Sequence, residues 1–188
     1  MRQKPFDGYD PMQPIYCTAL PHTHLPEHLK LKFRDLDHLF RDLVSSAVSR
    51  VTLVAPFWSV AGIDLLQDSL LVALERGAVV RLVVDARTDA AQLRGVAMWL
   101  SASGGAYGFR DRVRLLRSTD LITFVHAKMV LIDRAKGYLG SANITAGGLQ
   151  RNFELGVQLD ASQVDALEQM IAVFEAKGLL RDDSSFLY

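Results

Sequence analysis

Short apolar runs alternate with helix-like segments in the first half of this chain. Residues 51–55 (VTLVA) and 79–86 (VVRLVVDA) are rich in valine and leucine, and they are short enough to be strands buried on both faces. Residues 62–77 between them carry apolar side chains at helical spacing and end at Gly77, a residue suited to a C-cap. A strand, a helix and a second strand in succession favour helices packed on the faces of a sheet. The alternation therefore predicts an α/β fold, layered α-β-α with a mixed, largely parallel sheet.

The rest of the chain continues this pattern. Asp160 and Gln163 are spaced as a capping box, which predicts the start of a last helix. The further helices are expected at 34–50, 88–102 and 161–176. The further strands are expected at 112–117, 126–133, 138–142 and 153–159, and a loop is expected at Gly104, Gly105 and Gly108.

Proline is concentrated at the N-terminus, where five of the six prolines lie within the first 26 residues. Because proline fixes φ and lacks an N–H, residues 1–30 are predicted to be an irregular, proline-rich arm. The remaining residues, 31–188, suit a single catalytic domain. The arm holds one cysteine and three histidines whose spacing fits no standard zinc site, so we expect no metal there. These residues are Cys17, His22, His24 and His28.

The composition is that of a soluble globular protein, with 49% hydrophobic and 22% charged residues. No apolar run approaches the roughly 18 residues that span a bilayer, and the N-terminus lacks the apolar core of a signal peptide. The single cysteine, Cys17, excludes an intramolecular disulfide and favours a reducing compartment. We therefore expect a cytoplasmic protein with no membrane partner. The 21 basic and 21 acidic residues cancel, so a site for a polyanion must be local.

Residues 126–143 (HAKMVLIDRAKGYLGSAN) carry the densest set of reactive side chains. In a strand, residues two apart share a face, so His126 and Lys128 are predicted to project together. The segment Asp133–Gly137 suits a hairpin turn, with Gly137 available for a positive φ. The return strand would then bring Ser141 and Asn143 back beside His126.

These residue types suit attack on a phosphodiester without a metal or other cofactor. A neutral imidazole is a competent nucleophile or general acid–base group near pH 7. Lys128 and Asn143 can donate hydrogen bonds to the non-bridging phosphate oxygens. Ser141 or Glu154 is expected to accept from the second ring nitrogen of His126. Thr145 is expected to cap a short turn at residues 146–149, whose N–H groups would favour an anion.

The combination HAKMVLID plus GSAN resembles the signature of the phospholipase D superfamily, H-x-K-x4-D followed by G-S-x-N, and Asn152-Phe153-Glu154 resembles the N-x-E that often follows. The matching residues are His126, Lys128, Asp133, Gly140, Ser141, Asn143, Asn152 and Glu154. The resemblance implies a reaction in which one histidine forms a phosphohistidine and a second, from another copy of the motif, protonates the leaving oxygen. It also implies that no metal is needed. The resemblance puts Asp133 in the catalytic set, whereas an aspartate that only stabilises the hairpin is equally compatible with its position.

A second copy of the motif is not found in this chain. His28, Lys30 and Asp35 match H-x-K-x4-D, but the residues that should correspond to GSAN read DLVS (42–45) and share nothing with it. The family's single-motif endonucleases complete their site with a two-fold dimer. A two-fold axis puts the same residue on both sides of the interface, so we expect a homodimer in which the two His126 side chains face each other.

Two further groups are candidates for substrate binding. Phe57 and Trp58 follow the first strand, where they would either line a groove and stack bases or belong to the core. Arg112 and Arg114 lie just before the motif and would follow a nucleic-acid backbone if they share a face.

The resemblance leaves three functions open. The first is a nuclease or related phosphodiesterase acting on DNA or RNA, since single-motif members are often nucleases and similar domains occur in restriction and anti-phage systems, where other subunits of a larger defence complex would be partners. The second is a phospholipase or phosphatidyltransferase. The third is a non-catalytic nucleic-acid-binding subunit, against which the complete set of His126, Lys128 and Asn143 argues.

Overall fold

The computed structural model describes residues 15–17, 24–30, 33–102, 106–120 and 124–187. Within them, nine strands form one sheet in the order β2-β1-β8-β7-β6-β3-β4-β5-β9. The strands are β1 Ile15–Cys17, β2 Phe33–Asp35, β3 Arg50–Val54, β4 Val79–Val84, β5 Val113–Ser118, β6 Met129–Ile132, β7 Lys136–Gly140, β8 Leu155–Leu159 and β9 Leu180–Asp182.

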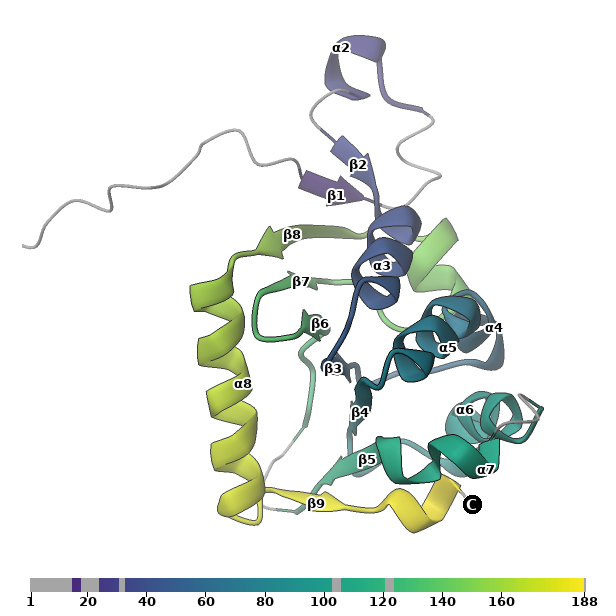
Figure 1. Ribbon diagram of the computed structural model, residues 1–188. Helices are drawn as coiled ribbons and strands as arrows, with labels where there is room; N and C mark the ends of the chain where they lie inside the picture. Colours follow the sequence, from purple (N-terminus) through teal and green to yellow (C-terminus); the bar gives the residue numbers. More distant parts are fainter. Residues whose placement is uncertain (1–14, 18–23, 31–32, 103–105, 121–123, 188) are drawn as a thin grey trace, which may run out of the picture.

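Helices cover both faces of the sheet (Figure 1). Helices α3, α4, α5 and α6 lie on one side, and the long α8 lies alone on the other, so the predicted α-β-α layering is confirmed. The helices are α2 Glu27–Lys30, α3 Leu36–Ser45, α4 Val60–Asp64, α5 Gln67–Glu75, α6 Ala90–Ala102, α7 Ala106–Phe109 and α8 Ala161–Ala176. None of them, among the described residues, is long and apolar enough to cross a bilayer.

The sheet is mixed, as expected, but less parallel than the sequence suggested. Parallel pairing joins β3 to β4, β4 to β5 and β1 to β2, whereas the other neighbouring pairs are antiparallel. The tight turn at residues 133–135 makes β6 and β7 antiparallel, because so short a connection cannot return a strand to the same direction.

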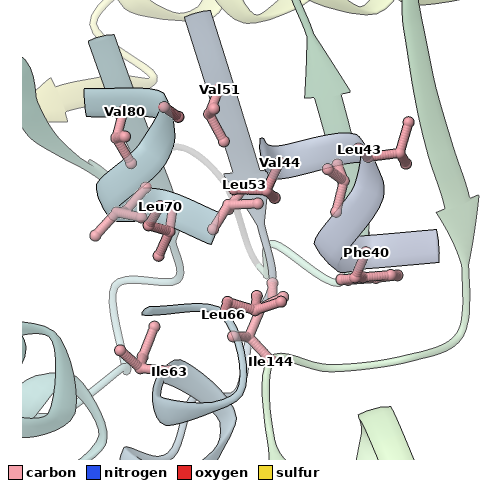
Figure 2. Close-up of a cluster of buried hydrophobic side chains, with 14 of the residues drawn as sticks. Phe40, Leu43, Val44, Val51, Leu53, Ile63, Leu66, Leu70, Val80 and Ile144 are labelled. Carbon is pink, nitrogen blue, oxygen red and sulfur yellow. The ribbon is translucent and has the colours of Figure 1, made fainter. Parts of the chain in front are cut away.

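The main core lies between the sheet and the larger helical layer. Side chains from α3, β3 and the α4–α5 pair meet there, as Figure 2 shows for Phe40, Leu53 and Leu66. A second cluster lies under α8 and includes Val54, Leu131 and Ile171. Strand β3 contributes to both because its successive side chains point to opposite faces. The three parallel strands are therefore buried on both sides, which explains their nearly continuous apolar sequences.

Several predicted elements differ in detail, and the helix expected over 34–50 is limited to α3, Leu36–Ser45. The helix expected over 62–77 is two helices, because Leu66 turns inward and its N–H bonds Ile63 O at 2.9 Å in a tight turn between them. The chain after α5 does turn at Gly77, whose φ of 96° is one that favours glycine. Gly108, expected in a loop, lies in α7, and the two other loop glycines fall outside the described residues. By contrast, α8 spans the predicted 161–176, and its capping box of Asp160 and Gln163 is present.

The N-terminal segment is more regular than predicted where it is described. Residues Ile15–Cys17 form β1, held by backbone pairing to both β8 and β2, and Tyr16 Oη donates to Gln158 Oε1 at 2.9 Å. Tertiary pairing thus overrides the local effect of the neighbouring prolines. The division into residues 1–30 and 31–188 remains a prediction.

The second motif-like match does not have the arrangement of the first. His28 and Lys30 lie on the short helix α2, and Lys30 pairs with Glu27. Asp35 is the N-cap of α3 and accepts from Asp37 N at 3.0 Å. This segment therefore supplies no second site of the same kind.

Candidate active site

His126 and Lys128 lie in an extended segment just before β6, not within the predicted strand. Strand β6 begins at Met129, opposite Val54, the last residue of β3. Beyond Val54, Ala55 N still bonds Val83 O of β4 at 3.2 Å, and Pro56 follows without an N–H. Residues 124–128 therefore have no partner on β3. They lie where the parallel strands end, a common place for ligand sites in α/β sheets.

Lys128 holds the His126 ring. Its Nζ lies 3.0 Å from His126 Nε2 and donates to the His126 carbonyl oxygen at 2.8 Å. An ammonium has only donors, so Nε2 is the acceptor and carries a lone pair in this arrangement. The lysine side chain is buried, whereas His126 is exposed. The geometry therefore presents an unprotonated imidazole nitrogen beside a cation at the surface.

Burial lowers the pKa of Lys128, and the carboxylate of Glu154 partly opposes this by favouring the charged form. His126 and Lys128 belong to one segment of the chain, and Glu154 belongs to another. The electrostatic influence of Glu154 on Lys128 connects the two segments.

Ser141 and Glu154 form a local network at the ends of β7 and β8. Ser141 Oγ donates to Glu154 Oε2 in a short hydrogen bond, and Asn152 Nδ2 donates to Oε1 at 3.2 Å. Leu155 N donates to Ser141 Oγ at 3.1 Å. The expected bond from this pair to the His126 ring is not formed within the described part of the chain, where Lys128 is the ring's hydrogen-bond partner.

Asn143 Oδ1 is buried and has no hydrogen-bond partner among the described residues. Such groups are rare in native proteins and often belong to functional sites. The following turn is a single π-helical turn, Gly147–Arg151, and Gly148 N donates to Thr145 Oγ1 at 2.9 Å, as the predicted cap requires. Side-chain and backbone polar groups thus gather around Asn143.

Asp133 does not belong to this group. Its carboxylate accepts three backbone N–H bonds from Val48, Ser49 and Arg50 at 2.6–2.9 Å, and a fourth bond from Ser49 Oγ at 2.7 Å. It lies at the end of β6 remote from Lys128 and ties the hairpin to the start of β3. The positive φ in the turn belongs to Asp133 (53°) and Arg134 (59°), not to Gly137 as predicted. These contacts favour the structural interpretation of Asp133 over the catalytic one.

The expected substrate contacts also need correction. Trp58 is buried in the main core and its Nε1 donates to Ala55 O at 2.8 Å, whereas Phe57 is 46% exposed. Arg112 and Arg114 do not share a face: Arg112 donates to Leu74 O, and Arg114 pairs with Glu175 of α8 and with Asp182. Both arginines also lie at the start of β5, the end of the sheet away from His126. They stabilise the fold and do not line this site.

Several residues near His126 escaped the sequence analysis. The Phe124 ring lies 5.1 Å from the His126 ring, and the Arg87 guanidinium lies 4.0 Å from the Phe124 centroid. Asp85 and Gln92 line a pocket on the α6 side of Phe124. A signal was present, since Asp85 lies at the end of the strand predicted at 79–86 and Arg87 follows it, where polar residues are often functional.

On the other side of Phe124 lies an apolar pocket of about 230 Å³. It is formed between the sheet and α8, with Met129, Ile171 and Phe174 in its walls, and His126 also lines it. Phe124 therefore lines both pockets, whereas His126 lines only the apolar one. Within the described ranges, no group of three or more histidine, cysteine, aspartate or glutamate side chains is arranged to hold a metal ion.

A family model described as "Cardiolipin synthase, PLD-like domain" matches residues 40–177, a range that contains the whole site. The chain belongs to the phospholipase D superfamily. The resemblance seen in the sequence is thereby confirmed.

Among curated relatives, cardiolipin synthase A of Pseudomonas putida (strain W619) is 29% identical over 149 residues, or 78% of this chain and 29% of the relative. Cardiolipin synthase A of Pseudomonas aeruginosa (strain LESB58) is 26% identical over 141 residues, or 74% of this chain and 27% of the relative. This phospholipase D-like chain thus spans less than a third of either relative.

Solved phospholipase D structures share the fold. Nuc, a phospholipase D family member from Salmonella typhimurium, aligns with a TM-score of 0.59 at 20% identity, covering 77% of this chain and 88% of Nuc. NucT from Helicobacter pylori has a TM-score of 0.58 at 12% identity, covering 90% and 98%. Phosphatidylserine synthase from Haemophilus influenzae has a TM-score of 0.58 at 14% identity, covering 79% of this chain and 37% of the synthase. These alignments, all at 20% identity or less, show that the fold is shared.

Proposed function

We propose that this protein is a metal-independent phosphodiesterase that cleaves DNA or RNA through a phosphohistidine intermediate. The observation that carries the proposal is the 3.0 Å contact between Lys128 Nζ and His126 Nε2. It supports a lone pair on Nε2 and a cation at the place where the phosphate charge would develop. In the first step Nε2 attacks phosphorus and the bond to the leaving oxygen breaks. In the second, water attacks phosphorus, the phosphorus–nitrogen bond breaks, and the histidine is regenerated.

The remaining site residues would bind and orient the phosphate. Lys128 and Asn143 would donate hydrogen bonds to its non-bridging oxygens, which gain charge in the transition state. The Asn143 side chain is suited to this because its buried oxygen has no partner in the described structure and the amide can reorient. Glu154 and Ser141 would act as positioning residues, through the charge of Glu154 beside Lys128.

The proton for the leaving oxygen would come from His126 of a second copy, which would later accept the proton of the attacking water. An exposed His126 supports such a shared site. Apolar side chains on β7, on β8 and just before β8 are also exposed beside the Ser141–Glu154 network, with exposures from 39% to 73%. They are Leu139, Phe153, Leu155 and Val157. Such a cluster is typical of a surface that is covered by a partner, so we propose a two-fold homodimer that brings the two His126 residues together.

A lipid phosphodiester is the second candidate substrate, and one structural observation favours it. The apolar pocket between α8 and the sheet adjoins His126 and has room for a short stretch of hydrocarbon. The curated relatives cited above are also named as cardiolipin synthases. The exposed ring of Phe57 and the Arg87 guanidinium stacked on Phe124 favour nucleic acid.

Cleavage that persists in EDTA tests the proposal. Purified protein is expected to cleave single-stranded DNA, duplex DNA or RNA in excess EDTA, and to act on phosphatidylcholine vesicles much more slowly. The four substrates are compared at equal phosphodiester concentration. Activity that disappears on chelation and returns with Mg²⁺ would exclude the proposed mechanism, and turnover of lipid alone would favour the second candidate.

The pH dependence of cleavage reports on Lys128. The protonated lysine donates to the phosphate, so activity should fall as the pH rises through its pKa. Because burial lowers that pKa, the alkaline limb is expected below the ordinary lysine value of 10.5. In Glu154→Gln the carboxylate that raises the pKa is removed, so the limb should move to still lower pH. The variant Glu27→Gln, which alters a surface pair on α2, should leave the limb in place. A limb that moves upward in Glu154→Gln contradicts the assignment.

A further inference from the structure

The pocket on the α6 side of Phe124 combines two aromatic rings with the polar side chains of Asp85, Arg87, Thr88 and Gln92. It has a volume of about 200 Å³, several times the roughly 30 Å³ of one water molecule in the liquid. It lies where β3 and β4 end, and Phe57, Arg87 and Gln92 are among its lining residues. We propose that this pocket binds one unpaired nucleobase next to the scissile phosphate, so that the substrate is single-stranded nucleic acid. This inference rests on the proposed function and names the strand state of its substrate.

Two aromatic rings form the walls. The centroids of Phe57 and Phe124 are 6.3 Å apart and their planes meet at 59°, so the rings do not stack on each other. Phe57 is 46% exposed, so its ring is open to a stacking partner. Stacking on an aromatic side chain is a common way to hold a base without regard to its identity.

Arginine supplies charge at the rim. The Arg87 guanidinium lies 4.0 Å from the Phe124 centroid, and its side chain is 64% exposed. Asp85 fixes this arrangement: Oδ1 accepts from Arg87 N and Nε at 3.0 Å and 2.8 Å, and Oδ2 accepts from Val125 N at 2.8 Å. Burial by itself raises the pKa of Asp85, but these hydrogen bonds together hold it below its usual value. Asp85 is therefore an ionised positioning group that holds both Arg87 and the segment leading to His126.

The amide of Gln92 supplies hydrogen bonding within the pocket. Its Oε1 is buried and has no partner among the residues that the structure describes. The other polar wall residue, Thr88, uses its hydroxyl to donate to Pro56 O at 3.1 Å. Gln92 Oε1 is thus suited to accept from an N–H or amino group on the edge of a base, and a buried acceptor atom without a partner favours a ligand that pairs with it.

The pocket lies next to His126, the proposed nucleophile, through the shared ring of Phe124. Phe124 is shared, since its ring contacts Phe57 on one side and lies 5.1 Å from the His126 ring on the other. A base stacked there would belong to a nucleotide adjacent to the attacked phosphorus. A base within a duplex is stacked on its neighbours and cannot enter such a pocket without leaving the helix, so an unpaired base is the natural occupant.

The same features disfavour a lipid headgroup at this position. Arg87 and Asp85 already pair with each other in this pocket, and a glycerol or serine headgroup has no planar ring to stack on Phe57. The phospholipid alternative therefore depends on the apolar pocket beneath α8, and the two pockets make opposite predictions for binding.

Binding measured without turnover tests the inference. Fluorescence anisotropy would follow a labelled single-stranded oligodeoxynucleotide, and the same strand with abasic central nucleotides, on a His126→Ala parent protein in EDTA. The parent is expected to bind the complete strand about tenfold more tightly than the abasic one, from stacking of one base. Adding Phe57→Ala should abolish the preference, and Phe57→Trp should restore it. Phe186→Ala removes a ring of similar exposure (43%) that does not line the pocket, and it should keep the preference.

Each contrary outcome has a distinct meaning. Equal binding of both strands by the parent, or a preference that survives Phe57→Ala, would overturn the base site and leave the proposed phosphodiesterase intact. Displacement of the complete strand by a soluble short-chain phosphatidylcholine, but not by a mononucleotide, would overturn it in favour of a lipid. If the His126→Ala parent shows a clear base preference but the unmodified protein does not cleave in EDTA, the proposed catalysis is rejected and the base-binding site stands.

Discussion

Replacing His126 with alanine is expected to reduce EDTA-resistant cleavage by on the order of 10⁴-fold or more, since loss of a nucleophile leaves only binding and electrostatic contributions. In a two-fold dimer the change removes the nucleophile from one copy and the general acid from the other, so both steps fail together. The His126 side chain is exposed, and its loss should leave the midpoint of thermal unfolding and the sedimentation coefficient unchanged. The matched control is His38→Ala, which removes an exposed histidine from α3.

Mixing the variant with wild-type protein tests the shared site directly. If each dimer holds one site built from two His126 residues, mixed dimers are inactive, and activity falls with the square of the wild-type fraction. A linear fall, or full activity of a species that is monomeric in sedimentation at the assay concentration, would contradict the dimeric site and leave the nucleophile assignment standing.

Replacing Asp133 with alanine is expected to cost about 3 kcal/mol or more of the free energy of unfolding, because hydrogen bonds to a charged acceptor contribute roughly 1.5–3 kcal/mol each and are partly replaced by water. Alanine also tolerates the φ of 53° less well than aspartate does. Asp133→Asn should be intermediate, since it keeps an acceptor and suits this conformation. Asp64→Ala, at an exposed position of α4, is the control. Urea unfolding measures all four proteins.

The pH dependence of that loss has a defined sign. Burial alone raises the pKa of Asp133, but the hydrogen bonds from Val48, Arg50 and Ser49 bring it below the ordinary 3.8. The stability due to the carboxylate is therefore fully present above pH 3.8 and is lost as the pH falls through the lower folded-state pKa. The difference between wild type and Asp133→Ala should be constant near neutrality and shrink only in acid. A variant that loses activity in proportion to its folded fraction, and no more, would agree with a structural Asp133.

Local patterns in the sequence were sufficient for much of the fold. The capping box at Asp160 and the apolar period after it predicted α8, because both depend on residues a few positions apart. The start of β6 could not be predicted in the same way. His126 and Lys128 continue the alternating pattern, but the strand needs a partner, and the pairing with β3 ends at Val54 and Met129.

The same distinction holds for the site. The motif brings Lys128 to His126 because the two are neighbours in the chain. The roles of Asp133 and Arg114 depend on contacts with segments 50 or more residues away, which no local spacing reveals. Arg87 and Gln92 were missed for a related reason, since only the parallel order of β3 and β4 brings them to the same edge as Phe57.

Strand β1 has a practical consequence for anyone shortening this protein. Its residues pair with β8 on one side, Ile15 opposite Val157 and Cys17 opposite Leu155, and with β2 on the other. A chain that begins after Cys17 would leave the N–H and C=O groups of β8 unpaired beside the exposed side chains of Leu155 and Val157. An open apolar edge is a template for another strand. Aggregation of such a shortened protein would reflect this uncovered edge, and it would say nothing about whether the half that carries His126 can fold.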